Sequence, residues 1–105
     1  MSGLHMIYTT CADKEAALEI ARTLVDEGLA ACGNIMPGLT SVFRWQGKRS
    51  EEDEVALILK TSAGRLEAAM ARVEELHAYD VPLVEAWPVA KVNQAFRDWV
   101  LAETS

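Results

Sequence analysis

The sequence is poor in the residues that build disulfide frameworks and zinc or redox sites. Its 105 residues include two cysteines, Cys11 and Cys32, and two histidines, His5 and His77. The cysteines form no Cys-x-x-Cys pair and are too few for a disulfide framework, so both are compatible with a reducing compartment. Nucleophile elbows, phosphate loops, Gly-x-Gly-x-x-Gly and His-Glu-x-x-His motifs are also missing. We therefore expect a protein that is not an enzyme.

Positive charge is scarce as well. The formal net charge is −6 and the sequence pI is about 4.8, with basic residues scattered along the chain. Because a surface that binds polyanions needs clustered lysine and arginine side chains, nucleic acid and anionic membranes are not expected partners. No apolar run approaches the roughly 20 residues of a membrane span, and the first residues lack the pattern of a secretory signal. We expect a soluble, cytoplasmic protein.

What the sequence does have is a long segment, Leu29–Thr61, with the pattern of a bent β-hairpin. Gln46–Lys48 form its turn, and Pro37-Gly38 predicts a bulge or bend in the first arm because proline cannot donate to a β-ladder. The returning arm is apolar at five consecutive positions, Val55–Leu59. Since neighbouring strand residues point to opposite faces, both faces of this strand need cover. One layer of helices covers one face, so we expect a second subunit on the other.

Capping and periodicity predict the remaining elements. Asp13 suits the N-cap of a helix that ends at Gly28, and Ser62 suits the cap of a second helix that ends near His77 to Tyr79. The expected order is strand 4–10, helix 14–28, hairpin 29–61, helix 62–79, extended segment 81–89 and helix 94–102. This order predicts an α+β fold: a ferredoxin-like βαββαβ sandwich with a long bent hairpin and a short C-terminal helix, in one domain of residues 1–105.

His77 has two interpretations. At the end of the second helix, its imidazole can interact with exposed backbone carbonyl groups, which is a structural role. Alternatively, the segment His77–Pro82 leads into a cleft between subunits, where the imidazole would bind a metal or a polar ligand. His5, in the N-terminal lead-in, is expected at the surface.

Cys11 lies between the first strand and the first helix. Near a helix N-terminus its thiolate would be stabilised, which favours metal binding or oxidation. Cys32 follows two alanines at the entry to the hairpin, and this setting is typical of a small buried packing residue. Cys11 is therefore the cysteine that we consider as a possible ligand.

Charged and aromatic residues suggest one further site. The acidic run Glu51–Glu54 could attract divalent cations, but alternation in a strand sends neighbouring carboxylates to opposite sides, whereas a chelating site needs oxygens that converge. A solvated hairpin arm that discourages edge aggregation is the better interpretation. Trp45, Lys60, Tyr79 and Trp87 combine an aromatic wall with one lysine, which would suit a small anionic or planar molecule. The alternative is that these aromatic side chains only pack against their neighbours.

Several motifs match one known family in combination. They are Thr10–Asp13, Leu29-Ala30-Ala31-Cys32, Asn34-Ile35, Pro37, Ser41, Trp45-x-Gly47-Lys48, Glu54, Lys60-Thr61, His77-x-Tyr79-x-x-Pro82 and Trp99. On these residues the chain resembles the CutA family of divalent-cation tolerance proteins over nearly its whole length. The resemblance implies a ferredoxin-like protomer in a homotrimer with clefts between subunits. It also implies a link to tolerance of copper and other divalent metals, without a settled catalytic activity.

The resemblance also implies which residues would be metal ligands, when the ligand positions of some relatives are matched to this chain one at a time. Where some relatives have a ligand cysteine in the first strand, this chain has Thr9, with Cys11 two residues later. Where they have two adjacent histidines, this chain has Leu76 and His77. His77 and Cys11 are therefore the predicted ligands, and copper is the first candidate because a thiolate and an imidazole suit it.

Three functions remain open from the sequence. The first is a non-enzymatic, trimeric tolerance protein that binds or responds to copper or another divalent cation. The second is a small-molecule sensor or signalling trimer, like the nitrogen-regulatory PII proteins, with an anionic ligand in clefts lined by Trp45, Lys60 and Tyr79. The third is a structural or scaffold trimer whose partner is another protein.

Overall fold

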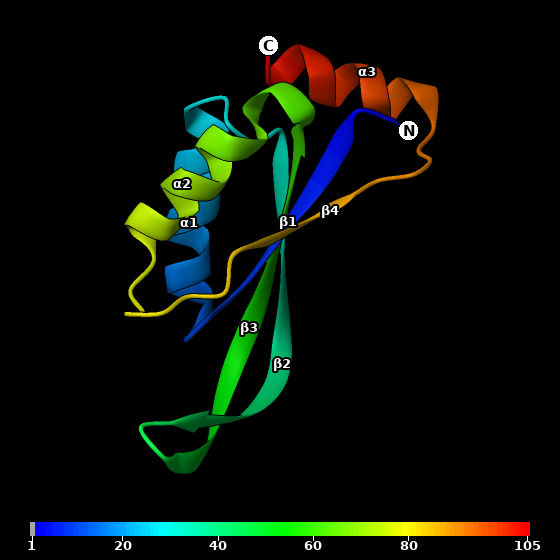
Figure 1. The fold of residues 1–105 in the computed structure, drawn as a ribbon. Helices are drawn as coiled ribbons and strands as arrows, with labels where there is room; N and C mark the ends of the chain where they lie inside the picture. The colour runs from blue at the N-terminus through cyan, green and yellow to red at the C-terminus, as the bar shows by residue number, and fades with distance from the viewer. Residues whose placement is uncertain (1) are drawn as a thin grey trace.

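The computed structural model describes residues 2–105 as an antiparallel sheet with helices packed on it (Figure 1). The elements are β1 (Leu4–Cys11), α1 (Lys14–Asp26), β2 (Cys32–Trp45), β3 (Lys48–Ser62), a 3-10 helix (Ala63–Arg65), α2 (Leu66–Leu76), β4 (Glu85–Pro88) and α3 (Gln94–Glu103). The strands lie in the order β2-β3-β1-β4. The predicted α+β, ferredoxin-like βαββαβ arrangement with a C-terminal helix is confirmed.

Helices α1 and α2 lie side by side on one face of the sheet and enclose the main core with it (Figure 1). Its largest fully buried side chains are Ile7, Leu24, Leu57, Leu59 and Val73. The Asp13 carboxylate accepts a 2.8 Å hydrogen bond from the N–H of Ala16, which confirms the predicted N-cap of α1. Gly28, just beyond α1, has a φ of 70° and supplies the predicted left-handed stop.

The β2–β3 hairpin extends well beyond the rest of the sheet and bends at its far end (Figure 1). The pairing register shifts between Met36 and Leu39, where Pro37-Gly38 interrupts the ladder, so the predicted bulge is confirmed. At the tip, Gln46 and Gly47 both have positive φ values, 51° and 80°. Positive φ at both central residues matches a tight two-residue hairpin turn.

Strand β3 is apolar on both faces, as its sequence predicts. Val55, Leu57 and Leu59 belong to the main core beneath the helices, and Ala56 and Ile58 alternate with them on the opposite face. We call the side of the sheet away from α1 and α2 the open face. Strand pairing places four further side chains on it: Met6, Tyr8, Met36 and Trp87. The rings of Tyr8 and Trp87 stack there with centroids 5.5 Å apart.

Helix α3 covers the end of the sheet where the chain starts (Figure 1). Val100 packs with Leu4 and Ala31 in a second, smaller core. The Nε of Arg65 donates a 2.9 Å hydrogen bond to the Thr104 carbonyl, which ties the end of α3 to the 3-10 helix. Within residues 2–105, no helix is long and apolar enough to cross a membrane.

Two local predictions are wrong. The 3-10 helix intervenes between Ser62 and α2, and the Ser62 hydroxyl makes no capping bond but accepts a 2.9 Å hydrogen bond from the Thr104 hydroxyl. The extended segment predicted over 81–89 contains only the short β4, which pairs with β1 from His5 to Tyr8. Pro82 has no backbone N–H to donate to a strand ladder, and β4 pairs with β1 only from Glu85 to Pro88.

Candidate functional site

The ends of β1 and α2 bring Cys11 and His77 together. Cys11 is the buried last residue of β1, and His77 is the C-cap residue of α2. The Sγ atom of Cys11 lies 3.9 Å from Nε2 of His77. The two metal ligands that the sequence predicts, far apart along the chain, are therefore neighbours in space.

Both ring nitrogens of His77 have hydrogen-bond partners. The backbone N–H of Tyr79 donates to Nδ1 at 3.2 Å, so Nδ1 must offer a lone pair. Nε2 then carries the hydrogen and donates it to the Thr10 carbonyl oxygen at 2.8 Å. The imidazole thus joins the end of β1 to the segment after α2. A metal would have to compete with these two contacts.

The Cys11 thiol is held protonated. Burial, with smaller contributions from the negative charges of Glu54 and Asp13, raises its pKa from 9.0 to about 11. The expectation that a helix terminus stabilises its thiolate is therefore wrong, because Cys11 belongs to the strand and the Asp13 carboxylate occupies the start of α1. Cys32, at the start of β2, is half-buried rather than buried, and desolvation raises its pKa as well.

Cys11 and His77 do not make a complete metal site within this chain. Among residues 2–105, no group of three or more His, Cys, Asp or Glu side chains lies close enough to hold an ion. Thr9, which the resemblance places at the ligand cysteine of some relatives, is fully buried. Its hydroxyl has no hydrogen-bond partner among the described residues. The pair therefore offers one thiol and one imidazole, and further ligands would have to come from elsewhere.

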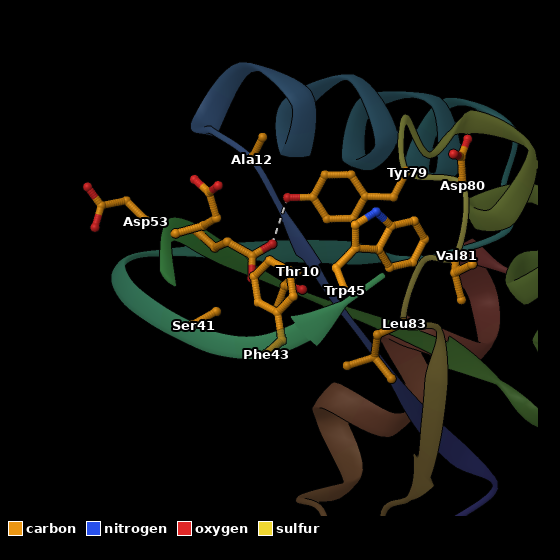
Figure 2. Close-up of a pocket in the computed structure, with 12 residues that line it drawn as sticks. Thr10, Ala12, Ser41, Phe43, Trp45, Asp53, Tyr79, Asp80, Val81 and Leu83 are labelled. Atoms are coloured by element: carbon orange, nitrogen blue, oxygen red, sulfur yellow. Dashed lines mark hydrogen bonds between the residues drawn. The ribbon is translucent and has the colours of Figure 1, made fainter. Parts of the chain in front are cut away.

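A cavity of about 630 Å³ lies between the hairpin, the end of β1 and the segment after α2 (Figure 2). Phe43 and Trp45 line it from β2, and Tyr79 lines it from the segment after α2. Lys60 is not among its lining residues: it lies on the open face of β3, where Nζ donates a 3.4 Å hydrogen bond to Asn34 Oδ1. Within one chain, the structure thus brings Trp45 and Tyr79 together and leaves Lys60 apart.

Negative charge lines the same cavity. Glu52, Asp53 and Glu54 of β3 contribute carboxylates, and Asp80 adds another. Glu54 is only 9% exposed, and its Oε2 accepts a 2.7 Å hydrogen bond from the Tyr79 hydroxyl, the dashed line in Figure 2. Desolvation, the hydrogen bond to Glu54 and nearby negative charge raise the pKa of Tyr79, so its hydroxyl keeps its hydrogen.

The interpretation of the acidic run as a solvated arm is wrong for Glu54. The sequence does contain a signal for this burial. Glu54 lies two residues before Ala56 and four before Ile58, so the strand period of two places all three on the same face of β3. The rings of His77 and Tyr79 lie with centroids 4.8 Å apart. A continuous row of contacts therefore leads from the buried thiol of Cys11 through His77 and Tyr79 to Glu54 at the cavity wall.

Comparisons with known proteins agree in sequence and in fold. The model of the family described as CutA1 divalent ion tolerance protein matches residues 5–103. The divalent-cation tolerance protein CutA of Thermus thermophilus is 42% identical over 100 residues, covering 95% of this chain and 97% of that protein. A crystal structure of CutA from Xylella fastidiosa matches with a TM-score of 0.95 at 37% identity, covering 98% of this chain and 99% of that one.

A plant relative is longer than this chain. The Arabidopsis thaliana protein named "Protein CutA, chloroplastic" is 38% identical over 99 residues, which are 94% of this chain and 54% of that protein. The chain thus spans nearly all of the bacterial relatives and about half of this plant relative.

Proposed function

This chain belongs to the CutA1 divalent ion tolerance protein family, and we propose that it binds copper, or another divalent cation, as a non-enzymatic tolerance protein of the cytoplasm. The proposed unit is a homotrimer of chains that each form one domain, residues 1–105. The observation that carries the metal proposal is the 3.9 Å separation between Cys11 Sγ and His77 Nε2.

The chemistry of this pair favours copper over magnesium or calcium. A thiolate and an imidazole are ligands for copper, whereas magnesium and calcium prefer oxygen atoms. The Sγ atom of Cys11 carries a hydrogen in the metal-free chain, since its pKa is about 11, and Nε2 of His77 has to give up its hydrogen bond to Thr10 and offer a lone pair. Binding through Sγ therefore releases the thiol proton and weakens at low pH. The negative charges of Glu54 and Asp13, which raise the thiol pKa, would favour a bound cation.

The homotrimer is supported by the open face of the sheet. Ala56 and Ile58 of β3 lie on it beside Met6 and Tyr8 of β1, away from α1 and α2. Trp87 keeps 41% of its surface exposed on the same face. Burying such a layer against other copies would remove apolar surface from water at about 25 cal/mol per Å². The number of three subunits comes from the family resemblance.

Calorimetric titration tests the metal proposal. Reduced, metal-free protein is titrated anaerobically with Cu(I), and separately with Zn(II) as a divalent probe. We expect saturable binding that weakens at least roughly tenfold in Cys11→Ala and in His77→Ala. Cys32→Ala is the matched control, because it removes the other free thiol and should leave the affinity unchanged. Absent saturation, or an equal loss in Cys32→Ala, would contradict the proposed site.

A small-molecule sensor is the second candidate, and the cavity lined by Trp45 and Tyr79 favours it. Its volume of about 630 Å³ falls in the range of pockets that hold small ligands, about 300–1,000 Å³. A thermal-shift panel separates the two candidates, because a ligand that binds only the folded protein raises its apparent stability. Stabilisation by nucleotides or organic acids but not by metal would favour the sensor with an anionic ligand.

A further inference from the structure

We propose that His77 couples metal binding to the long hairpin: its Nε2 atom can bind a metal only when the ring hydrogen moves to Nδ1, and this move displaces Tyr79 from Glu54. The inference rests on the proposed metal site at Cys11 and His77, and it gives that site an effect beyond holding an ion. It uses hydrogen bonds made within one chain, which lead from β1 through His77 and Tyr79 to β3.

The two nitrogens of the His77 ring have opposite roles in this structure. Nε2 donates to the Thr10 carbonyl oxygen at 2.8 Å, and Nδ1 accepts the backbone N–H of Tyr79 at 3.2 Å. A neutral imidazole carries one hydrogen on its two nitrogens, so one of them donates and the other accepts. The hydrogen on Nε2 is therefore what leaves Nδ1 free to accept from Tyr79.

Metal binding beside Cys11 requires these roles to reverse. Cys11 Sγ lies 3.9 Å from Nε2, so Nε2 is the ring nitrogen that can share a metal with the thiolate, and it must then offer its lone pair. The ring hydrogen moves from Nε2 to Nδ1 by exchange with water, and the ring keeps the same number of hydrogens. The hydrogen bond to the Thr10 carbonyl is lost, because Nε2 no longer has a hydrogen to donate.

The reversal places two donors against each other. The new N–H at Nδ1 of His77 faces the backbone N–H of Tyr79, and neither group can accept from the other. The backbone at Tyr79 therefore has to move until both hydrogens find other acceptors. Residues 78–84 belong to no helix or strand, so this segment can shift without breaking either kind of element.

Tyr79 carries this movement to the hairpin. Its ring lies 4.8 Å from the His77 ring, between centroids, and its hydroxyl donates a 2.7 Å hydrogen bond to Oε2 of Glu54 on β3 (Figure 2). A hydrogen bond of this kind extends to about 3.0 Å, so a shift of the Tyr79 side chain by about 1 Å is enough to break it. The loss of this bond frees the Glu54 carboxylate from the segment after α2.

Reciprocity supplies the first test. If metal binding breaks the bond between Tyr79 and Glu54, that bond opposes metal binding to the same extent. Tyr79→Phe removes the hydroxyl in advance, so it should tighten Cu(I) binding by roughly threefold or more in an anaerobic calorimetric titration of the full chain. Tyr8→Phe is the control, because the Tyr8 ring stacks on Trp87 and should leave the affinity unchanged. A purely structural role of Tyr79 would not raise the affinity.

NMR of the same titration reads the ring and the carboxylate directly, because Cu(I) is diamagnetic. The ¹⁵N signal of His77 Nδ1 should change from that of a nitrogen with a lone pair to that of a nitrogen with a hydrogen. The carboxyl carbon signal of Glu54 should shift at the same copper concentrations and lose most of this shift in Tyr79→Phe. The carboxyl carbon of Glu51, on the same strand, is the control. Unchanged signals of Leu24 and Val73 report that each variant is folded.

The outcomes separate this coupling from the metal site itself. Tighter copper binding in Tyr79→Phe, together with the change at Nδ1, supports the coupling. Copper binding that weakens in Cys11→Ala and His77→Ala, but leaves the lone pair on Nδ1 or the affinity of Tyr79→Phe unchanged, overturns the coupling while the proposed function stands. A Glu54 shift that persists in Tyr79→Phe also overturns it, because the metal would then act on Glu54 directly. Absent copper binding overturns both.

Discussion

The hydroxyl of Tyr79 donates a 2.7 Å hydrogen bond to Oε2 of Glu54 and so joins the segment after α2 to the long hairpin. We expect Tyr79→Phe to lower the free energy of unfolding by about 1–2 kcal/mol, because it leaves a nearly buried carboxylate without this donor. Tyr8→Phe is the control, since the Tyr8 ring stacks on Trp87 and its hydroxyl has no side-chain hydrogen bond within residues 2–105. Denaturant unfolding at one fixed protein concentration measures both changes, and equal losses would count against the role of the bond.

The raised pKa of Cys11 predicts a loss of stability at alkaline pH. Because the folded pKa of about 11 lies above the ordinary 9.0, the neutral thiol contributes stability below pH 9.0 that is lost as the pH rises toward 11. We expect Cys11→Ala to remove this part of the pH dependence. Unfolding free energies at about pH 8 and about pH 10 test it. Thr9→Ala, a neighbouring buried change without a titrating group, should keep the wild-type slope.

Gly33 lies where β2 crosses beneath α1. A Cβ atom there would lie 2.9 Å from Leu59 Cδ2 and 3.3 Å from the Cβ of Ala21, both in the main core. We expect Gly33→Ala to destabilise the protein by about 1–3 kcal/mol through overpacking. Gly64→Ala is the matched control, because no atom lies within 4 Å of its added Cβ. Urea unfolding of both variants tests the prediction. An unchanged free energy of unfolding in Gly33→Ala would contradict it, because the core would then accommodate the added methyl group without cost.

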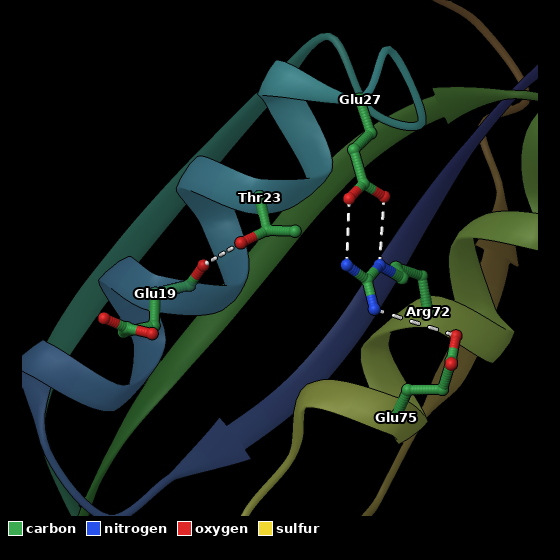
Figure 3. Close-up of polar contacts among 5 residues, drawn as sticks. All are labelled: Glu19, Thr23, Glu27, Arg72 and Glu75. Carbon is green, nitrogen blue, oxygen red and sulfur yellow. Dashed lines mark hydrogen bonds and ion pairs between the residues drawn. The ribbon is translucent and has the colours of Figure 1, made fainter.

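Arg72 of α2 binds both carboxylate oxygens of Glu27 at 2.9 Å, and it lies 4.0 Å from Glu75 (Figure 3). These hydrogen bonds hold the pKa of Glu27 below 4.5, so their stabilising effect is present above that pH and is lost as the pH falls. We expect Arg72→Ala to lower the melting temperature slightly at about pH 7 and not at about pH 3.

Arg22→Ala is the control for this ion pair. Arg22 and Glu15 lie 3.6 Å apart with side chains 63% and 75% exposed, so solvent screens their attraction and no measurable change is expected. A melting temperature difference for Arg72→Ala that persists in acid would show that packing of its side chain, rather than its charge, is responsible.

Ile58 tests the proposed subunit contact. It lies at the centre of the open face, opposite Tyr8 on β1 and Asn34 on β2. We expect Ile58→Lys to convert a trimer into smaller species, because a charge buried between subunits would lack a partner. Light scattering at micromolar concentration measures the mass. Val25→Lys, on the exposed outer side of α1, should leave the mass unchanged. A wild-type mass of one chain would overturn the trimer itself.

Local rules determined much of the fold. The Asp13 cap, the left-handed Gly28 and the bulge at Pro37-Gly38 each depend on a few neighbouring residues, and each appears where the sequence predicts it. The unbroken run of apolar residues Val55–Leu59 likewise determined that both faces of β3 would carry apolar side chains, because neighbouring strand residues point to opposite faces.

Long-range packing decided the rest. The Ser62 hydroxyl bonds to Thr104 instead of capping a helix, since α3 returns to the start of the sheet and offers a partner that no local pattern reveals. Cys11 is a buried, protonated thiol rather than a stabilised thiolate because Glu54 and the core surround it.

The meeting of Cys11 with His77, and the cavity between the hairpin and Tyr79, depend on how the sheet twists and where α2 ends. Sequence spacing determines which face of its own element a residue occupies, because strand and helix periodicity are local. Only the tertiary structure decides which residues of different elements lie within a few ångströms, since that distance is set by the packing of the whole chain.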